Sequence, residues 1–174
     1  MASLSELAPD SQISPDGQLA PTVCTAQDVA RGVSRLLWHA GIAPLTEVPL
    51  GNGRRADVVG IGSDGLITLV EIKVSLADLR GDAKWPEYLD YCDHYYWAVP
   101  PGFPLGDFEA EWFQPDRAGL IIADRWDAAI IRPAAWVRLS GARRKAETLR
   151  FARRGAQRLL WLGDPGADEG LRLP

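Results

Sequence analysis

Two β-branched runs separated by a glycine-rich turn constrain this chain more than any other feature. The runs cover residues 54–61 and 66–74, and residues 62–65 between them read Gly-Ser-Asp-Gly. β-Branched side chains favour a pleated backbone, and glycine permits tight turns. The pattern therefore predicts a β-hairpin.

Beyond the leading Arg54 and Arg55, three charged residues interrupt these runs: Asp57 in the first, and Glu71 and Lys73 in the second. The two-residue period of a strand places Glu71 and Lys73 on one face. Asp57 lies opposite Glu71 on that face if Ile61 pairs with Ile67 across a five-residue loop. A four-residue loop would separate the carboxylates unless a bulge corrected the register. A shared site therefore depends on this hairpin register.

Two facing carboxylates suit a hard divalent cation. Mg²⁺ (or Mn²⁺) takes oxygen ligands and keeps several waters, so Asp57, Glu71 and the backbone carbonyl of Ile72 are sufficient protein ligands. Such an ion promotes phosphodiester hydrolysis, and Lys73 would orient the attacking water. The alternative is a solvated sheet face with ordinary polar residues. We favour the metal site because paired carboxylates repel unless a cation or proton intervenes.

The length of 174 residues and the apolar fraction of 47% suit one α/β domain. Residues 1–22 contain three prolines and predict a flexible tail, with a single domain over residues 23–174. Neither a membrane-length apolar run nor a secretory signal is evident, so we expect a cytoplasmic location. Two cysteines and two histidines without a partner pattern indicate neither a disulfide framework nor a zinc site.

Periodicity and capping signals predict the remaining elements. A helix begins at Thr25 and ends at Gly41, and a strand at residues 43–50 makes the hairpin a three-strand antiparallel meander. A second helix begins between Asp82 and Trp85, with an apolar stripe facing the sheet. Further strands are expected at residues 95–99, 119–123 and, at an edge, 128–132. The order predicts an α/β fold with a mixed central sheet flanked by helices.

The last long helix is expected at about residues 142–162, with six apolar residues inward and most arginines outward: Ala146, Leu149, Ala152, Ala156, Leu159 and Leu160. The formal net charge of the chain is −4, yet residues 132–158 carry a local charge of +8. A cationic helix on an acidic body is typical of a protein that binds a phosphate backbone. A solvated helix face is the alternative.

Beyond the hairpin, the chain resembles a known family. The order helix, meander, helix, strand with Asp57 and Glu71-Ile72-Lys73 resembles the PD-(D/E)XK, or restriction-endonuclease-like, nuclease superfamily, although Ala56 replaces its proline. Further motifs extend the likeness over about residues 25–162 and are similar to the bacterial MmcB-type DNA repair family: Glu71 to Ser75, Asp78, Asp82, Lys84-Trp85, Tyr88, Cys92-Asp93, Tyr96 to Pro100, Gly119 to Asp124, Ala142 to Lys145, Leu149 to Arg153 and Arg158-Leu159.

The resemblance implies a bacterial, metal-dependent DNA endonuclease of repair, with Asp57, Glu71 and Lys73 as catalytic residues. Phosphate contacts carry little base information, so we expect selectivity for DNA structure or damage. Repair proteins are further candidate partners. A DNA-binding module that keeps the fold without cleaving, and an RNA-processing nuclease, remain alternatives.

The superfamily often has an acid before the meander and a polar residue on the following helix. Glu47 is a candidate for the first, with a surface acid as the alternative. Lys84 is a candidate for the second, with Ser75 and Asp82 as auxiliary or capping residues. The candidate DNA-binding residues are basic: Arg54, Arg55, Lys84, Arg143, Arg144, Lys145, Arg150, Arg153 and Arg154.

Overall fold

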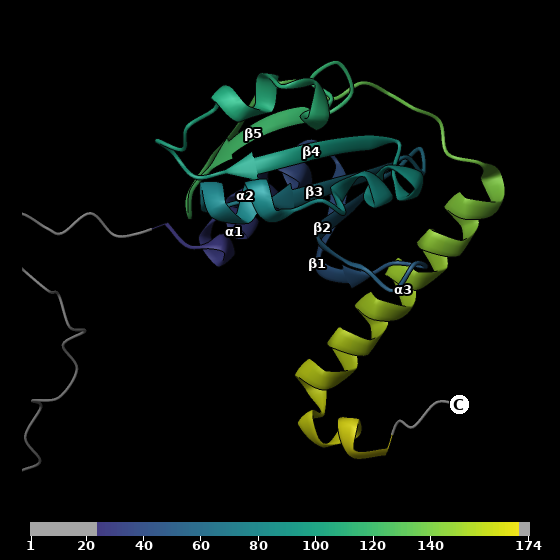
Figure 1. Ribbon diagram of the computed structural model, residues 1–174. Helices are drawn as coiled ribbons and strands as arrows, with labels where there is room; N and C mark the ends of the chain where they lie inside the picture. Colours follow the sequence, from purple (N-terminus) through teal and green to yellow (C-terminus); the bar gives the residue numbers. More distant parts are fainter. Residues whose placement is uncertain (1–23, 171–174) are drawn as a thin grey trace, which may run out of the picture.

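The computed structural model describes residues 24–170, so the tail expected at residues 1–22 lies outside the described residues. Its centre is one sheet whose six strands follow one another in sequence order (Figure 1). The strands are β1 (Ile42–Pro49), β2 (Arg55–Gly62), β3 (Ile67–Ile72), β4 (His94–Val99), β5 (Gly119–Ala123) and β6 (Ala128–Arg132). The first three and the last pair are antiparallel, whereas β3, β4 and β5 run parallel. The predicted mixed α/β sheet with an initial meander is confirmed.

Helix α1 (Ala26–His39) begins as its capping signal predicts. The Thr25 hydroxyl accepts a hydrogen bond from the Asp28 amide, and the Asp28 carboxylate accepts one from the Thr25 amide. These two bonds satisfy amides that the first helical turn leaves without partners. Apolar residues of α1, among them Val29, Val33 and Leu37, are buried against one face of the sheet. The N-terminal half of the helix thereby lies next to Asp57, beside the candidate site.

The hairpin has the register that the sequence analysis required. Ile61 pairs with Ile67, and Val58 pairs with Val70. The same register, continued by one residue, places Asp57 opposite Glu71. The geometric condition for a shared carboxylate site is met.

The opposite face of the sheet is covered by helix α2 (Leu76–Gly81) and a 3-10 helix at Trp85–Tyr91 (Figure 1). The helix expected to start between Asp82 and Trp85 does begin at Trp85, but it is a 3-10 helix, and the preceding helix α2, capped by Ser75, was not predicted. The apolar stripe predicted for the helix at Trp85 is buried: Trp85, Tyr88, Leu89 and Cys92.

Helix α3 (Gly141–Gly163) extends beside β1 and away from the sheet (Figure 1). The prediction of its inward face was wrong. Leu149, Leu159 and Leu160 are 55%, 71% and 50% exposed, and Glu147 is the residue that α3 buries. The helix contacts the body through arginine side chains, such as Arg144 to Asp93 and Arg158 to Thr46, and through Phe151, which packs against the core. The described residues contain no helix long and apolar enough to span a membrane.

Candidate functional site

The predicted catalytic residues meet at the end of the β2–β3 hairpin. Glu71 and Lys73 are buried and Asp57 is half-buried. The Ile72 amide donates a 2.8 Å hydrogen bond to Asp57 Oδ2, which ties the first carboxylate to the strand that carries the second. Lys73 Nζ lies 3.6 Å from Glu71 Oε1. The chain thus places two carboxylates and one ammonium group together, and Glu71 and Lys73 have little access to water.

The electrostatics of this group differ from those of an ordinary ion-pair cluster. Burial and the neighbouring charge of Asp57 raise the pKa of Glu71 to about 8. Burial also raises the pKa of Asp57, against the opposing hydrogen bond from Ile72. Glu71 Oε2 is buried without a hydrogen-bond partner, which is costly for a carboxylate oxygen. Protonation of Glu71 or a nearby cation would offset this cost.

Lys73 is held chiefly by an acid that follows it in the chain. Its Nζ lies 2.7 Å from Asp82 Oδ2 and 3.8 Å from Asp78 Oδ1. Burial favours the neutral amine, but the Asp82 hydrogen bond and the charge of Glu71 outweigh it and raise the pKa of Lys73. Lys73 therefore stays charged. Asp82 Oδ1 accepts a hydrogen bond from the Lys84 amide, just before the 3-10 helix at Trp85–Tyr91, while Asp82 Oδ2 positions the Lys73 ammonium group.

A cleft of about 790 Å³ opens beside Asp57, between the N-terminal half of α1 and the sheet. Glu47 and Ile72 also line it, as do Arg31 and Arg125. Glu47 lies across from Asp57 in the β1–β2 register, between the pairs Thr46–Val58 and Val48–Ala56. It has a left-handed φ of 49°, which costs free energy for a residue with a side chain. The strained acid and Asp57 therefore face one cleft.

The other auxiliary candidates have simpler roles. The Ser75 hydroxyl accepts from the Asp78 amide and caps α2, so the capping alternative accounts for Ser75. Lys84 is exposed at the start of the 3-10 helix. Glu47 lies in β1, with its carboxylate 3.7 Å from Arg55.

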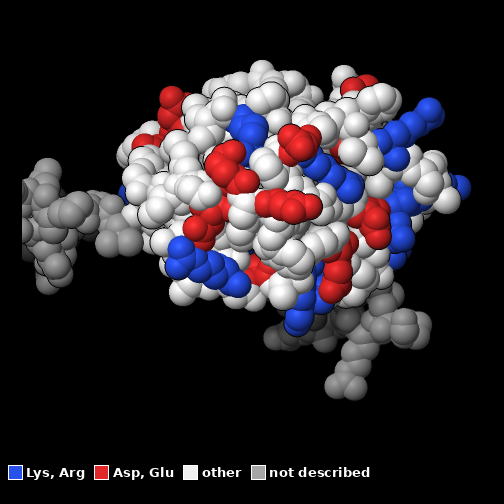
Figure 2. All heavy atoms as spheres, turned by 45° about the horizontal axis from the view of Figure 1, so that its top comes forward, with Lys and Arg blue, Asp and Glu red and all other residues white. Residues whose placement is uncertain are grey.

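Most of the basic candidates contact the protein itself. Arg54 makes a two-bond contact with Glu87, and Arg144 makes one with the buried Asp93. Arg143 stacks over Tyr91, Arg150 pairs with Glu147 and Arg154 bonds Gln157. In the described residues, Lys84, Lys145 and Arg153 make no ion pair. The expectation that most α3 arginines point outward was wrong, because these contacts hold them against the protein. On the face that Figure 2 shows, acidic and basic side chains are interspersed.

The donor set fits a hard divalent cation. Two carboxylates leave room for the waters that Mg²⁺ retains, and the unpartnered Glu71 oxygen lacks a positive neighbour at hydrogen-bond distance. Within residues 24–170 of the structure, no group of three or more His, Cys, Asp or Glu side chains is arranged to hold a metal ion. A bound ion would accordingly depend on Asp57, Glu71 and a main-chain oxygen such as that of Ile72.

Comparisons with known proteins define the family. Residues 14–166 match the family described as DNA repair protein MmcB-like. The chain belongs to the MmcB-like DNA repair protein family. The resemblance seen in the sequence is thus confirmed at the level of the family, and the expected link to DNA follows from it. A search of curated proteins found no match.

Two solved structures are similar to the chain. A protein of unknown function from Silicibacter pomeroyi is 42% identical, with 85% of this chain and 95% of that chain covered and a TM-score of 0.74. A repair endonuclease from Pyrococcus abyssi is 20% identical, with 40% and 36% covered and a TM-score of 0.28. The first supports the fold over most of this MmcB-like chain. The second likeness is too small to support an argument.

Sequence reasoning missed two of the polar residues that shape this region and the role of a third. Arg31 and Arg125 line the cleft, although they are 94 positions apart in the sequence. Asp82 was identified, but its contact with Lys73 was not predicted. The helical position of Arg31, one turn beyond Asp28 on α1, was the available signal for its place at the cleft, and none was available for Arg125.

Proposed function

We propose that this MmcB-like chain is a metal-dependent DNA endonuclease that hydrolyses phosphodiester bonds during repair. One observation carries the proposal: Asp57 and Glu71 face each other on paired strands, with a buried Glu71 oxygen that has no partner. Asp57, Glu71 and the Ile72 carbonyl would hold Mg²⁺ or Mn²⁺. That ion would supply charge neutralisation at the phosphate and a hydroxide-like nucleophile.

The protein's own groups have separate tasks in this reaction. Lys73 orients the attacking water and stabilises the charge that develops on the phosphate, because it is buried and remains protonated. Asp82 fixes the position of Lys73 through its 2.7 Å contact. Arg31 and the nitrogens of Arg125 that its ion pair with Asp28 leaves free lie in the cleft beside Asp57 and would bind the phosphates flanking the scissile bond. Selectivity for DNA structure then follows from the shape of the cleft.

The test is cleavage of nicked, flapped, gapped and intact DNA by purified protein with Mg²⁺ or Mn²⁺. Asp57→Ala and Lys73→Ala should each lower the cleavage rate by about a hundredfold or more. Asp116→Ala is the matched control, because Asp116 is an exposed acid outside this group and should be silent. Cleavage that persists in Asp57→Ala would remove the assignment.

Two other results would favour the alternatives. Binding to DNA without cleavage by any metal-loaded sample would indicate a non-cleaving recruitment module. Preferential cleavage of RNA in direct competition would indicate an RNA-processing nuclease.

A further inference from the structure

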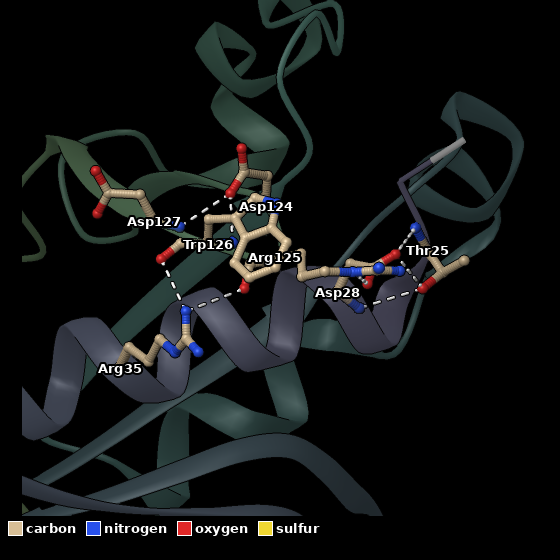
Figure 3. Close-up of polar contacts among 7 residues, drawn as sticks. All are labelled: Thr25, Asp28, Arg35, Asp124, Arg125, Trp126 and Asp127. Atoms are coloured by element: carbon tan, nitrogen blue, oxygen red, sulfur yellow. Dashed lines mark hydrogen bonds and ion pairs between the residues drawn. The ribbon is translucent and has the colours of Figure 1, made fainter. Parts of the chain in front are cut away.

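The turn between β5 and β6 is held by hydrogen bonds among its own residues. Asp124 Oδ1 accepts hydrogen bonds from the Trp126 and Asp127 amides, at 2.6 and 2.9 Å (Figure 3). The Asp124 amide donates to the Asp127 carbonyl. Each polar group that closes the turn belongs to the turn itself, so its backbone has one defined conformation.

The same turn is fastened to α1 at two points. Arg35 Nη1 donates to the Trp126 carbonyl at 3.2 Å, and Arg125 Nε donates to Asp28 Oδ1 at 2.7 Å (Figure 3). Hydrogen bonding from Arg125 holds the pKa of Asp28 at about 2. Gly32 allows the close approach, because a Cβ there would meet the Asp127 carbonyl oxygen at 2.7 Å and overlap that of Asp124. The turn is therefore a rigid extension of α1.

The side chain that this turn presents is Trp126, which is 67% exposed. The turn contacts hold its backbone and leave its indole ring open to solvent. The guanidinium carbon of Arg31 lies 6.0 Å from the ring centroid. Indole is a large apolar surface, and an exposed indole on a fixed backbone beside a cation can serve as a platform on which a planar ring stacks.

The position of Trp126 beside the cleft indicates which kind of planar ring would stack on it. Arg31 and Arg125, the neighbours of Trp126, both line the cleft that contains Asp57. Phosphates bound by these two arginines would bring attached bases to the rim where Trp126 lies. A base inside a duplex has both faces stacked, whereas an unpaired base has a face free for the indole.

We infer that Trp126, with Arg31 and Arg125, is a binding site for an unpaired nucleobase and its flanking phosphates, which makes DNA with an extrahelical or single-stranded nucleotide the preferred ligand. This inference rests on the proposed function, because it places the unpaired nucleotide beside the cleavage site. Base stacking on indole tolerates any base, so the site selects DNA structure without selecting sequence.

The experiment compares two 30-bp duplexes that differ only in a central three-nucleotide bulge, so that contributions from the duplex ends cancel. Affinity is measured by fluorescence anisotropy in EDTA. The full-length protein should prefer the bulged duplex. Trp126→Ala should weaken binding to the bulged duplex by about 5- to 150-fold while leaving the intact duplex nearly unchanged. Trp126→Phe should retain much of the preference, because it keeps an aromatic face.

Two further variants sharpen the result. Trp38 is also 67% exposed, at the far end of α1, so Trp38→Ala is the matched control and should leave the preference intact. Gly32→Ala should displace the turn and reduce the preference although the indole remains. The inference would be overturned if Trp126→Ala lost affinity for both duplexes equally, or if it bound both as the unmodified protein does. It would also be overturned if Trp38→Ala lost as much affinity for the bulged duplex as Trp126→Ala, or if the unmodified protein did not prefer the bulged duplex.

This outcome is separable from that of the proposed function because EDTA prevents metal-dependent cleavage. A Trp126-dependent preference without cleavage in Mg²⁺ would remove the nuclease proposal and keep the base site. Cleavage that is independent of Trp126 would do the reverse.

Discussion

Two buried acids, Glu71 near the end of β3 and Asp93 beside its first residue, have pKa values shifted in opposite directions. Glu71, near the last residue of the strand, has an oxygen without a partner and a raised pKa. Asp93 accepts hydrogen bonds from the Ile67 and Leu139 amides and two from Arg144. Burial alone would raise the pKa of Asp93, but these bonds outweigh it and lower the pKa. Burial is therefore common to both ends, and the supply of donors separates a structural acid from a candidate functional one.

The largest effect on stability should come from removing Asp93, whose carboxylate accepts four hydrogen bonds. Asp93→Ala leaves Arg144 and two amides without their partner, so the free energy of unfolding should fall by about 3–5 kcal/mol. Urea denaturation followed by circular dichroism measures it. Asp90→Ala removes an exposed acid nearby and should change stability little. A loss below about 1 kcal/mol for Asp93→Ala would break the comparison.

The second effect is a dependence of stability on pH that Glu71 produces. Without metal, folded Glu71 keeps its proton up to about pH 8, whereas the unfolded chain releases it near 4.5. The folded state binds more protons, so stability should fall as pH rises between these values, by at most about 1.4 kcal/mol per pH unit. Glu71→Gln should flatten this slope, and Asp116→Asn should keep it. Thermal unfolding in EDTA from pH 5 to 8 checks both.

A smaller effect concerns backbone strain at the Glu71 end. Glu47 occupies a left-handed conformation that glycine adopts without a Cβ penalty. Glu47→Gly should therefore be more stable than Glu47→Ala by about 1 kcal/mol. Both variants remove the same carboxylate and should cleave DNA equally. Equal stability of the two would show that the strain has no cost.

Local sequence rules predicted the parts of this structure that depend on neighbouring residues. The capping box predicted the start of α1, and strand alternation left two hairpin registers open, of which the structure has the one that joins Asp57 to Glu71. The failures involve contacts between distant segments. The inward face of α3 was wrong because Arg144 reaches Asp93, 51 positions away, and periodicity carries no information about such a partner.

The candidate site shows the same division. The positions of the carboxylates followed from strand geometry, whereas the attachment of Lys73 to Asp82 depends on where α2 ends. No local pattern in the sequence singled out Trp126, because the position of its turn depends on contacts with Arg35 and Gly32 of α1, which lie far away in the sequence. The metal and catalytic roles remain predictions.

The strand order β1-β2-β3-β4-β5-β6 has a consequence for how the chain acquires its structure. Each new strand joins the strand that precedes it in the sequence, so none must be inserted between two strands already paired. The antiparallel pairs β1–β2, β2–β3 and β5–β6 have short sequence separation and close small loops, which favours their rapid formation, whereas the parallel pairs β3–β4 and β4–β5 must close longer ones. During synthesis, the hairpin carrying Asp57 and Glu71 can form before β4 has emerged. The site would then be assembled early, and the turn bearing Trp126 would join it almost last.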